Sequence, residues 1–515
     1  MNHNLYLQFL PHFERQPSKV LIDTPEGKRY RYADVLATTQ RLAGALQELD
    51  VQPGDRVAVQ VDKSPEAIML YLACLQVGAA YLPLNTAYTG SEIEYFLGDA
   101  EPQLYVCAPE RVGDAMRFCQ AGSVVHVESL SAAGDGSLMD RAAKAEPVTE
   151  VAQLGEHDLA AILYTSGTTG RSKGAMLSHG NLASNSRALA EAWRFSTDDH
   201  LLHALPIFHT HGLFVACNIV LTVGASMTFM PGLDVEQLLD LMPRATVLMG
   251  VPTFYSRLLK SPRLDRETVA NMRLFVSGSA PLLAETHEGF HERTGHAILE
   301  RYGMTETNMN TSNPYDGERR PGTVGFPLPG TELRITDLES GAELPRGETG
   351  LVELRGPNVF QGYWRMPEKT RAEFRDDGFF ITGDLGRVDA DGYLHIVGRD
   401  KDLVISGGYN VYPKEVEQLI DELPGVAESA VFGVAHPDLG EGVTAVVVAK
   451  EGQTPPDEAS VQAALADRLA RYKQPKRVFI IEALPRNVMG KVQKNQLRDT
   501  YADLYTAEEV EATVG

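Results

Sequence analysis

Strand and helix patterns alternate from about residue 55 to residue 303, and this alternation restricts the possible folds more than any other feature. The predicted strands are almost continuously apolar, which is typical of parallel sheets covered by helices on both faces. Ser64 is a suitable N-cap for the first helix of the series. In this first part of the chain the patterns predict strands at 56–61, 80–84 and 103–107, with helices at 64–78 and 91–100.

A second series of apolar strands follows, and each of them ends in a polar or glycine-rich loop. Ligands of such sheets bind at the carboxyl ends of the strands. We therefore expect the functional residues in these loops. The strand patterns of this series occupy 159–166, 200–207, 245–250, 273–279 and 297–303.

The pattern changes after the second series, which indicates further units. Short strands with glycine turns at about 323–399 predict a small β subdomain. Helical patterns at 412–423 and 457–470, set among strands, predict a separate α+β domain. A chain of 515 residues has room for about three such units. We expect an N-terminal domain at 1–399, which includes the subdomain, and a C-terminal lid domain at 400–515.

Composition excludes several classes of protein. A formal charge of −22 argues against non-specific binding of nucleic acid. The four cysteines form no CxxC pair, so disulfides and cysteine-ligated zinc are not expected. The N-terminus lacks the pattern of a signal peptide, and the apolar stretch 67–84 fits a buried helix followed by a strand better than a membrane span. We expect a cytoplasmic enzyme with no membrane and no obligatory protein partner.

The segment YTSGTTGRSKG, at 164–174, directly follows a predicted strand. Its glycines, hydroxyl groups and backbone N–H groups can surround phosphate oxygens, and Lys173 can add positive charge. The spacing differs from that of a Walker A loop. The segment therefore predicts a phosphate site of another kind.

With this loop, six motifs resemble those of the adenylate-forming superfamily, which includes acyl-CoA synthetases, peptide-synthetase adenylation domains and beetle luciferase. They occur in the order of that superfamily and span nearly the whole chain. The resemblance implies an α/β fold with stacked mixed sheets in a large N-terminal domain, a small β subdomain and a mobile C-terminal lid. The motifs are YTSGTTGRSKG (164–174), VSGSAP (276–281), RYGMTET (301–307), TGD (382–384), GRDKDLVISGGYNVYPKEVE (398–417) and PRNVMGKVQK (485–494).

The resemblance also implies a role for each motif in binding ATP and Mg²⁺. Glu306 would bind Mg²⁺ together with Thr165, since this cation takes carboxylate oxygens and keeps several waters. Tyr302 would stack on the adenine, and Asp384 would bind the ribose. Lys491, Glu306, Thr165 and Lys173 would be catalytic. The residues expected around ATP are Thr165, Ser166, Gly167, Thr168, Thr169, Gly170, Lys173, Gly278, Ser279, Ala280, Pro281, Glu300, Arg301, Tyr302, Gly303, Met304, Thr305, Asp384, Arg399 and Lys491.

Movement of the lid is a further implication of the resemblance. Lys491 would stabilise the negative charge that develops while the adenylate forms. Rotation about a hinge at Asp400 would then remove Lys491 and bring in a coenzyme A site. That site would consist of Ser406, Gly407, Gly408 and Tyr409, where the glycines leave room for the pantetheine arm.

The acid is suggested by two arginines, Arg257 and Arg301, near the expected acyl pocket. Guanidinium binds carboxylate bidentately, so the pair suits a second carboxylate better than an apolar tail. Three segments around these residues are similar to malonate–CoA ligases of the superfamily. We therefore expect ATP-dependent ligation of malonate to coenzyme A, with methylmalonate as a second substrate. The expected acid-binding residues are Arg257, Arg301, Ser279, Met304, His209 and His211.

Other interpretations remain at this stage. Arg257 could point outward into a surface pair. The HxH pattern at 209–211 could bind zinc, although no acidic or cysteine partner lies at the usual spacing. The chain could be a ligase for another short-chain acid, or an adenylation domain that loads a carrier protein. A light-emitting oxygenase is also compatible with the fold.

Overall fold

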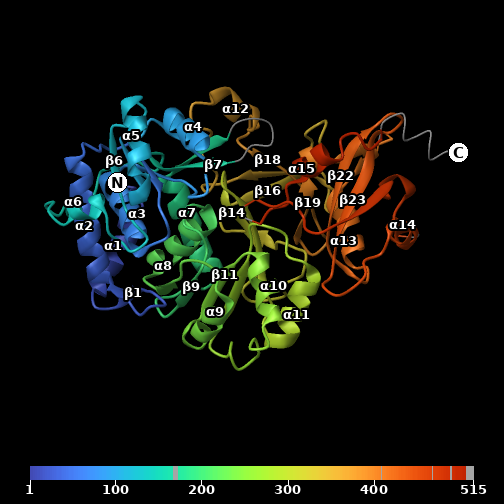
Figure 1. The fold of residues 1–515 in the computed structure, drawn as a ribbon, viewed down its shortest axis with the longest axis horizontal. Coiled ribbons are helices and arrows are strands. Elements are labelled where there is room, and N and C mark those ends of the chain that lie inside the picture. The colour runs from blue at the N-terminus through green and yellow to red at the C-terminus, as the bar shows by residue number, and fades with distance from the viewer. Residues whose placement is uncertain (166–171, 408, 467, 488–489, 506–515) are drawn as a thin grey trace. The chain divides into compact units, whose positions relative to one another are not determined.

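The computed structural model describes residues 1–165, 172–407, 409–466, 468–487 and 490–505 (Figure 1). The chain divides into two compact units. The first unit contains 1–332 and 354–380, and the second contains 333–353 and 381–515. The predicted β subdomain at 323–399 is thus divided about evenly between the two units. The predicted domain boundary at 399/400 remains a prediction.

The first series of predicted strands forms a six-stranded sheet in the first unit. Strands β3, β4, β5, β6 and β7 are parallel to their neighbours, as expected from their apolar sequences. Strand β8, for which no strand was predicted, pairs antiparallel with β7, so the sheet is mixed, as the resemblance implied. In sheet order the strands are β6 (His126–Ser129), β5 (Leu104–Cys107), β3 (Arg56–Gln60), β4 (Ala80–Pro83), β7 (Leu159–Thr165) and β8 (Lys173–Ser178).

The second series forms a nine-stranded sheet in the same unit. Its inner strands are parallel, and antiparallel strands close both edges. In sheet order they are β15 (Phe326–Pro327), β14 (Asn308–Ser312), β13 (Leu299–Met304), β12 (Leu274–Ser277), β11 (Val247–Gly250), β9 (His200–His203), β10 (Ser226–Phe229), β1 (Val20–Asp23) and β2 (Arg29–Arg31).

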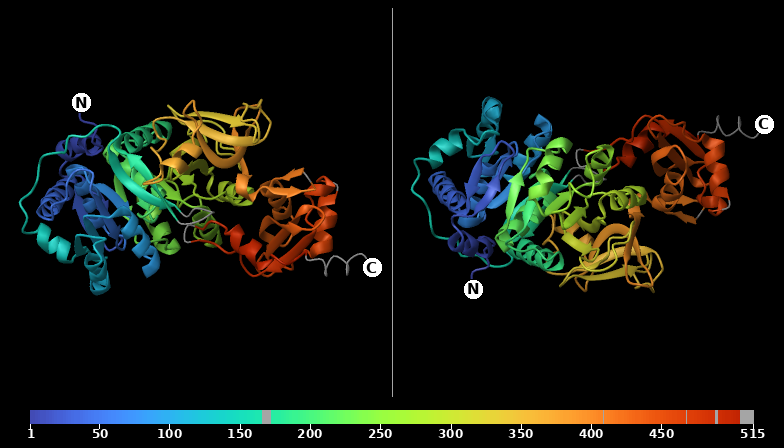
Figure 2. Two further views of the ribbon diagram at one scale, coloured as in Figure 1. Left: turned by 90° about the horizontal axis from the view of Figure 1, so that it is seen from above. Right: turned by 90° about the horizontal axis from the view of Figure 1, so that it is seen from below.

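Helices fill the space between these two sheets and cover their outer faces (Figures 1 and 2). The hydroxyl of Tyr71 on α3 donates to Asn218 Oδ1 on α8 at 3.2 Å, so helices that follow strands of different sheets meet in a common layer. The helices of this unit are α1 (Tyr6–Arg15), α2 (Tyr32–Glu48), α3 (Pro65–Val77), α4 (Gly90–Ala100), α5 (Val112–Gln120), α6 (Ser137–Ala142), α7 (His179–Ala192), α8 (Asn218–Val223), α9 (Val235–Leu241), α10 (Pro252–Lys260), α11 (Ala284–Thr294) and α12 (Pro367–Ala372).

Helix α3 shows how closely local signals determine an element. Ser64 caps its first turn by accepting a hydrogen bond from the Ala67 N–H, as predicted. Gly78 ends it in the left-handed conformation with φ of 85°, which glycine adopts without steric cost. All thirteen residues of the helix are buried. The apolar stretch that begins inside it is therefore a core helix followed by strand β4.

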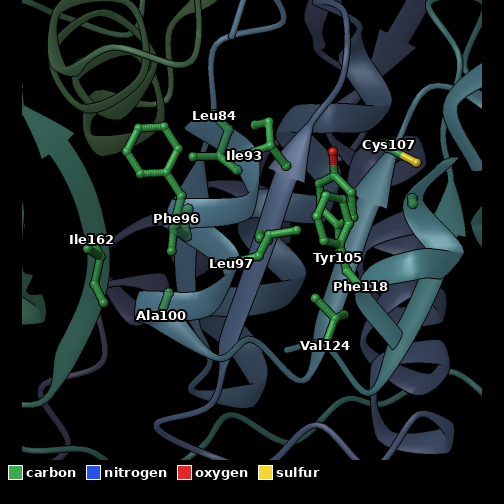
Figure 3. Close-up of a cluster of buried hydrophobic side chains, with 13 residues drawn as sticks. Leu84, Ile93, Phe96, Leu97, Ala100, Tyr105, Cys107, Phe118, Val124 and Ile162 are labelled. Carbon is green, nitrogen blue, oxygen red and sulfur yellow. The ribbon is translucent and has the colours of Figure 1, made fainter. Parts of the chain in front are cut away.

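A second part of the core lies on the outer side of the six-stranded sheet (Figure 3). One face of α4 contributes Ile93, Phe96 and Leu97, which pack toward Tyr105 on β5 and Ile162 on β7. Burial of each such side chain contributes about 1.5–3 kcal/mol. This packing holds β7, which leads into the predicted phosphate loop.

The second unit contains two sheets and three helices among its described residues. One sheet consists of β16 (Glu332–Thr336), β17 (Gly350–Arg355), β18 (Phe380–Val388) and β19 (Leu394–Arg399). The other consists of β21 (Tyr409–Val411), β20 (Val404–Ser406), β23 (Gly440–Ala449), β22 (Val426–His436) and β24 (Arg477–Ile481), with α13 (Pro413–Asp421), α14 (Glu458–Ala466) and α15 (Lys494–Thr500). The helices predicted at 412–423 and 457–470 correspond to α13 and α14.

Across the described ranges, no helix combines the length and apolar character needed to cross a membrane.

Candidate active site

The carboxyl ends of four parallel strands meet at one edge of the nine-stranded sheet. Strand β9 pairs in parallel with β11, β11 with β12, and β12 with β13. The last residues of these strands are His203, Gly250, Ser277 and Met304. Because parallel strands end on the same side, the loops that follow them lie together, as expected for a ligand site.

Arg301 on β13 is buried at this edge, with 4% of its surface exposed. Its guanidinium lies directly against the loop after β12, and a Cβ at Gly278 would be 2.2 Å from Arg301 Cζ. Among the described residues, neither Nε nor Nη2 of Arg301 has a hydrogen-bond partner. Burial lowers the pKa of Arg301 to about 9, so the group still carries its charge at neutral pH.

His211 and Ser279 adjoin this guanidinium. Ser279 Oγ lies 3.2 Å from His211 Nδ1, and Ser279 has a positive φ of 71°, which is unusual for a residue with a side chain. His211 is buried, and its Nε2 contacts no polar group in the described part of the chain. Burial, followed by the nearby Arg301 charge, holds the pKa of His211 well below its usual range. His211 is therefore neutral.

Together Arg301, His211 and Ser279 form a buried polar cluster, named here the carboxylate pocket. A buried guanidinium without a counterion is unfavourable, and an anionic ligand with several acceptor oxygens would relieve this. The structure brings Arg301, Ser279 and His211 together, and their predicted role in binding the acid remains a prediction. Arg257 differs, because its position on α10 is exposed. Its predicted role in binding the acid remains a prediction, but it is not a buried cation.

Glu306 follows β13 and is buried, with 6% of its surface exposed. The hydroxyl of Tyr363 lies 3.1 Å from Glu306 Oε1 and 2.6 Å from Glu373 Oε2. Lys173, on β8, forms an ion pair with Glu373 at 3.4 Å and lies over the ring of Tyr363. A single buried carboxylate beside a phosphate site fits the way Mg²⁺ is held together with substrate phosphates and waters. Glu306 and Lys173 are thus linked through Tyr363 and Glu373.

Tyr363 and Glu373 were not among the predicted site residues. Tyr363 is separated from Glu306 by 57 positions in the sequence, so no local spacing connects them. The only available signal was the aromatic pair Tyr363–Trp364 in a glycine-containing loop, which is equally typical of core packing. Sequence reasoning finds residues within one motif more readily than their neighbours from a distant segment.

Other predicted ATP contacts lie in the first unit, on strands of both of its sheets. Thr165 is the last residue of β7 and pairs with Lys173 on β8. Tyr302 is almost fully buried on β13. Glu300 accepts a hydrogen bond from the Gly322 N–H, and burial raises the pKa of its carboxyl group. The predicted phosphate contacts Ser166, Gly167, Thr168, Thr169 and Gly170 lie outside the described residues.

In the second unit, the predicted nucleotide residues Asp384 and Arg399 are partners on adjacent strands. Asp384 on β18 pairs in register with Arg399 on β19, and Arg399 Nε lies 2.6 Å from Asp384 Oδ1. Asp384 is buried, so its carboxylate keeps a fixed orientation. Asp400, the predicted hinge, begins a short 3₁₀ turn directly after β19.

The predicted coenzyme A residues and the predicted catalytic lysine also belong to this unit. Ser406 and Tyr409 lie on the β20–β21 hairpin, where Ser406 is buried and Tyr409 is exposed. Gly407 has a positive φ of 61°, and Gly408 lies outside the described residues. Lys491 is exposed, and its N–H donates to Asn487 Oδ1 at 3.0 Å. Their roles remain predictions.

Metal binding by a cluster of protein side chains receives no support. In the part of the chain that the structure describes, no group of three or more histidine, cysteine, aspartate or glutamate residues is placed to hold a metal ion. His209, predicted to shape the acid pocket, accepts a hydrogen bond at Nδ1 from the His211 N–H at 3.3 Å.

Known proteins are similar to this chain over most of its length. Residues 10–364 match the family described as AMP-binding enzyme, and residues 415–491 match the AMP-binding enzyme C-terminal domain. The chain is 35% identical to the indoleacetate–CoA ligase of Aromatoleum aromaticum, with 95% of this chain and 97% of the relative covered. It is 33% identical to the malonate–CoA ligase of Arabidopsis thaliana, with 92% and 85% covered.

A solved structure is more similar. The crystal structure of ATP-bound MatB from Rhodopseudomonas palustris is 59% identical and superposes with a TM-score of 0.96, covering 98% of this chain and 100% of that one. The similarity extends over both compact units.

Proposed function

Because the chain belongs to the AMP-binding enzyme family, we propose that it is an AMP-forming acid–CoA ligase that acts on malonate. ATP and malonate would form malonyl-adenylate with release of pyrophosphate. The thiol of coenzyme A would then displace AMP and give malonyl-CoA. Methylmalonate is the second acid that we expect the enzyme to accept.

The observation that carries the choice of acid is the carboxylate pocket. Relatives of similar identity act on acids as different as indoleacetate and malonate, so identity at that level does not select the acid. The buried Arg301, whose Nε and Nη2 atoms find no acceptor among the described side chains, favours an acid with a second negative charge. A monocarboxylate with an apolar tail would leave this charge unpaired at a cost of several kcal/mol.

In this reaction, the residues of the first unit would bind the acid, the phosphates and Mg²⁺. Arg301 and His211 would orient the malonate so that one carboxylate faces the α-phosphate. Lys173 would contribute positive charge at the outer phosphates after it leaves Glu373. Glu306 would hold Mg²⁺, which neutralises phosphate charge when bound. Tyr363 keeps its proton, because burial and the two nearby carboxylates raise the pKa of its hydroxyl. The hydroxyl lies within hydrogen-bond distance of both Glu373 and Glu306 and shares its single proton between them, so it keeps the two carboxylates side by side.

Residues of the second unit would act in both half-reactions. Lys491 would act during adenylate formation, and Asp384 with Arg399 would bind the ribose. After rotation about Asp400, the hairpin containing Ser406, Gly407, Gly408 and Tyr409 would admit coenzyme A. The match of residues 415–491 to the family's C-terminal domain supports this assignment. We further propose that the enzyme works in the cytoplasm on small molecules without an obligatory protein partner.

An exchange assay tests this function directly. Incorporation of labelled pyrophosphate into ATP is measured with malonate, methylmalonate, acetate, octanoate and indoleacetate, and thioester formation is measured with and without coenzyme A. We expect malonate to give the highest kcat/KM, methylmalonate a lower value and the monocarboxylates the lowest. Preference for a monocarboxylate would contradict the choice of acid, and transfer to a carrier protein in place of coenzyme A would contradict the ligase assignment.

A further inference from the structure

A second buried polar network lies behind the carboxylate pocket, and the reaction described above does not use it. Lys63, in the loop after β3, donates from Nζ to His203 Nδ1 at 2.8 Å and to the His203 carbonyl oxygen at 2.7 Å. The same Nζ atom lies 4.4 Å from the centre of the Phe229 ring, and burial lowers the pKa of Lys63 well below its usual range. Lys63 therefore joins the end of β3 in one sheet to the end of β9 in the other.

These contacts determine the tautomer of His203. Because a carbonyl oxygen can only accept, the Gly212 carbonyl places the proton of the neutral imidazole on Nε2, and Nδ1 then accepts from Lys63. Nε2 lies 2.7 Å from the Gly212 carbonyl oxygen and donates to it. Burial is the main reason that the pKa of His203 lies well below its usual range, so the ring stays neutral and this donor is retained.

Gly212 belongs to the first turn of η2 (His211–Cys217), a π-helix that continues into α8. Its α-carbon is pressed against the preceding loop, where a Cβ would lie 2.0 Å from the Pro206 carbonyl oxygen. A π-helical turn is rare and often occurs at functional sites. The bond from His203 holds this turn at the residue directly after His211.

We propose that His203 and Lys63 are positioning residues that set acid selectivity by fixing the first turn of η2, and with it His211, against the carboxylate pocket. This inference rests on the proposed malonate specificity. The link is continuous from Lys63 through His203 and Gly212 to His211, which contacts Ser279 and adjoins Arg301. Neither His203 nor Lys63 needs to touch the acid.

Matched variants separate positioning from general stability. His203→Phe keeps a ring of similar size and removes the contacts of the imidazole with Lys63, with the Gly212 carbonyl and with Cys217 Sγ, which lies 3.3 Å from Nε2 at the end of η2. His203→Gln retains a donor that can reach Gly212. Lys63→Met keeps the contact with Phe229 and removes the donor to Nδ1. His200→Phe is the control, because His200 is the partly buried histidine at the opposite end of β9, bonded to Ser226 and Thr228.

The readouts are KM for malonate, KM for ATP and the ratio of malonate to acetate kcat/KM. We expect His203→Phe to lower this ratio about tenfold or more through malonate KM, with ATP KM unchanged, as for loss of one oriented hydrogen bond near substrate. His203→Gln should restore most of the ratio, Lys63→Met should lower it less than His203→Phe does, and His200→Phe should leave it unchanged.

An unchanged ratio in folded His203→Phe, or an equal change in the His200→Phe control, would overturn the inference. If His203→Phe does not fold, Lys63→Met decides, and an unchanged malonate KM in that variant has the same consequence. A wild-type enzyme without preference for malonate would instead refute the proposed function, and the inference with it. A selective wild type with unaffected variants refutes the inference alone.

Discussion

From the sequence alone, Arg257 and Arg301 are equally good candidates for binding a second carboxylate. In the structure, they differ in exposure to solvent. Arg257 belongs to the segment GVPTFYSRLL, and Arg301 directly precedes YGMTE. The structure buries Arg301 below Gly278 and leaves Arg257 exposed on α10. An exposed charge is screened by water, whereas a buried one depends on its partner. We therefore expect the larger loss of malonate kcat/KM when Arg301, and not Arg257, is replaced.

We predict that Arg301→Ala lowers malonate kcat/KM by about 3–5 kcal/mol in transition-state free energy, the size expected when one partner of a buried ion pair is removed. Arg257→Ala should cost about 1 kcal/mol or less, as for an exposed pair. Steady-state kinetics with malonate and acetate check both variants, and acetate should be affected least. A larger loss for Arg257→Ala would place the second carboxylate at α10.

Glu306→Gln tests the metal ligand while the shape of the side chain is kept. The neutral amide can still accept a hydrogen bond from Tyr363, but it binds Mg²⁺ poorly because the charge is gone. We predict a large fall in the rate of pyrophosphate exchange and a higher Mg²⁺ concentration for half-maximal activity, with an unchanged circular dichroism spectrum. Normal Mg²⁺ dependence would require another carboxylate as ligand.

At the scale of elements, the order of strands and helices could be predicted from the sequence. The residues at which many elements end, and the strands at the edges of the sheets, could not. Helix α3 follows its capping residues closely. By contrast, the strand expected at 200–207 ends at His203, and the chain then enters a π-helix that no periodicity in the sequence indicates. Its register depends on tertiary contacts such as the one from His203. The motif residues could be named because short segments resemble those of a known superfamily. Tyr363 and Glu373 belong to none of these segments, and their place beside Glu306 depends on packing between distant parts of the chain.

The loop after β12 offers a test at this scale. Gly278→Ala would place a methyl group 2.2 Å from Arg301 Cζ, so the guanidinium or the loop must move. We predict a rise of about tenfold or more in malonate KM, since the buried charge would be displaced from its orientation. Gly232→Ala is the matched control, because a Cβ there meets no atom within 4 Å. Equal kinetics in both variants would mean that Arg301 is not constrained by this loop.

At the scale of the whole molecule, the path of the chain bears on where a lid can rotate. The chain passes between the two compact units at 332/333, 353/354 and 380/381. A rotation at that boundary would have to bend three connections. A rotation at Asp400, directly after β19, needs a change in one connection only. Because β19 and α13 are in contact, a rotation there would also have to separate these two elements, and the hinge at Asp400 remains a prediction.

Asp400→Pro examines this hinge by restricting φ at residue 400 to about −65°. We predict that the variant retains malonate-dependent pyrophosphate exchange and loses transfer to coenzyme A. Both half-reactions are measured separately, the second from supplied malonyl-adenylate. Thioester formation at the wild-type rate would place the hinge elsewhere.

Lys491→Ala should give the opposite result. The ammonium is expected to act only while negative charge develops at the α-phosphate. We predict loss of pyrophosphate exchange, with much of the thioester step from supplied malonyl-adenylate retained. Equal loss of both half-reactions would contradict an enzyme with two lid positions.

The short strands at the two ends of the nine-stranded sheet affect how molecules of this protein meet one another. At one end, β2 has only three residues, and its two arginines are exposed. At the other end, β15 has two residues, and Pro327 has no N–H to offer a further strand. An incoming chain would meet like charges at one edge and a missing donor at the other. Such edges oppose sheet-to-sheet aggregation, so concentrated protein should resist growth of intermolecular β structure from this sheet.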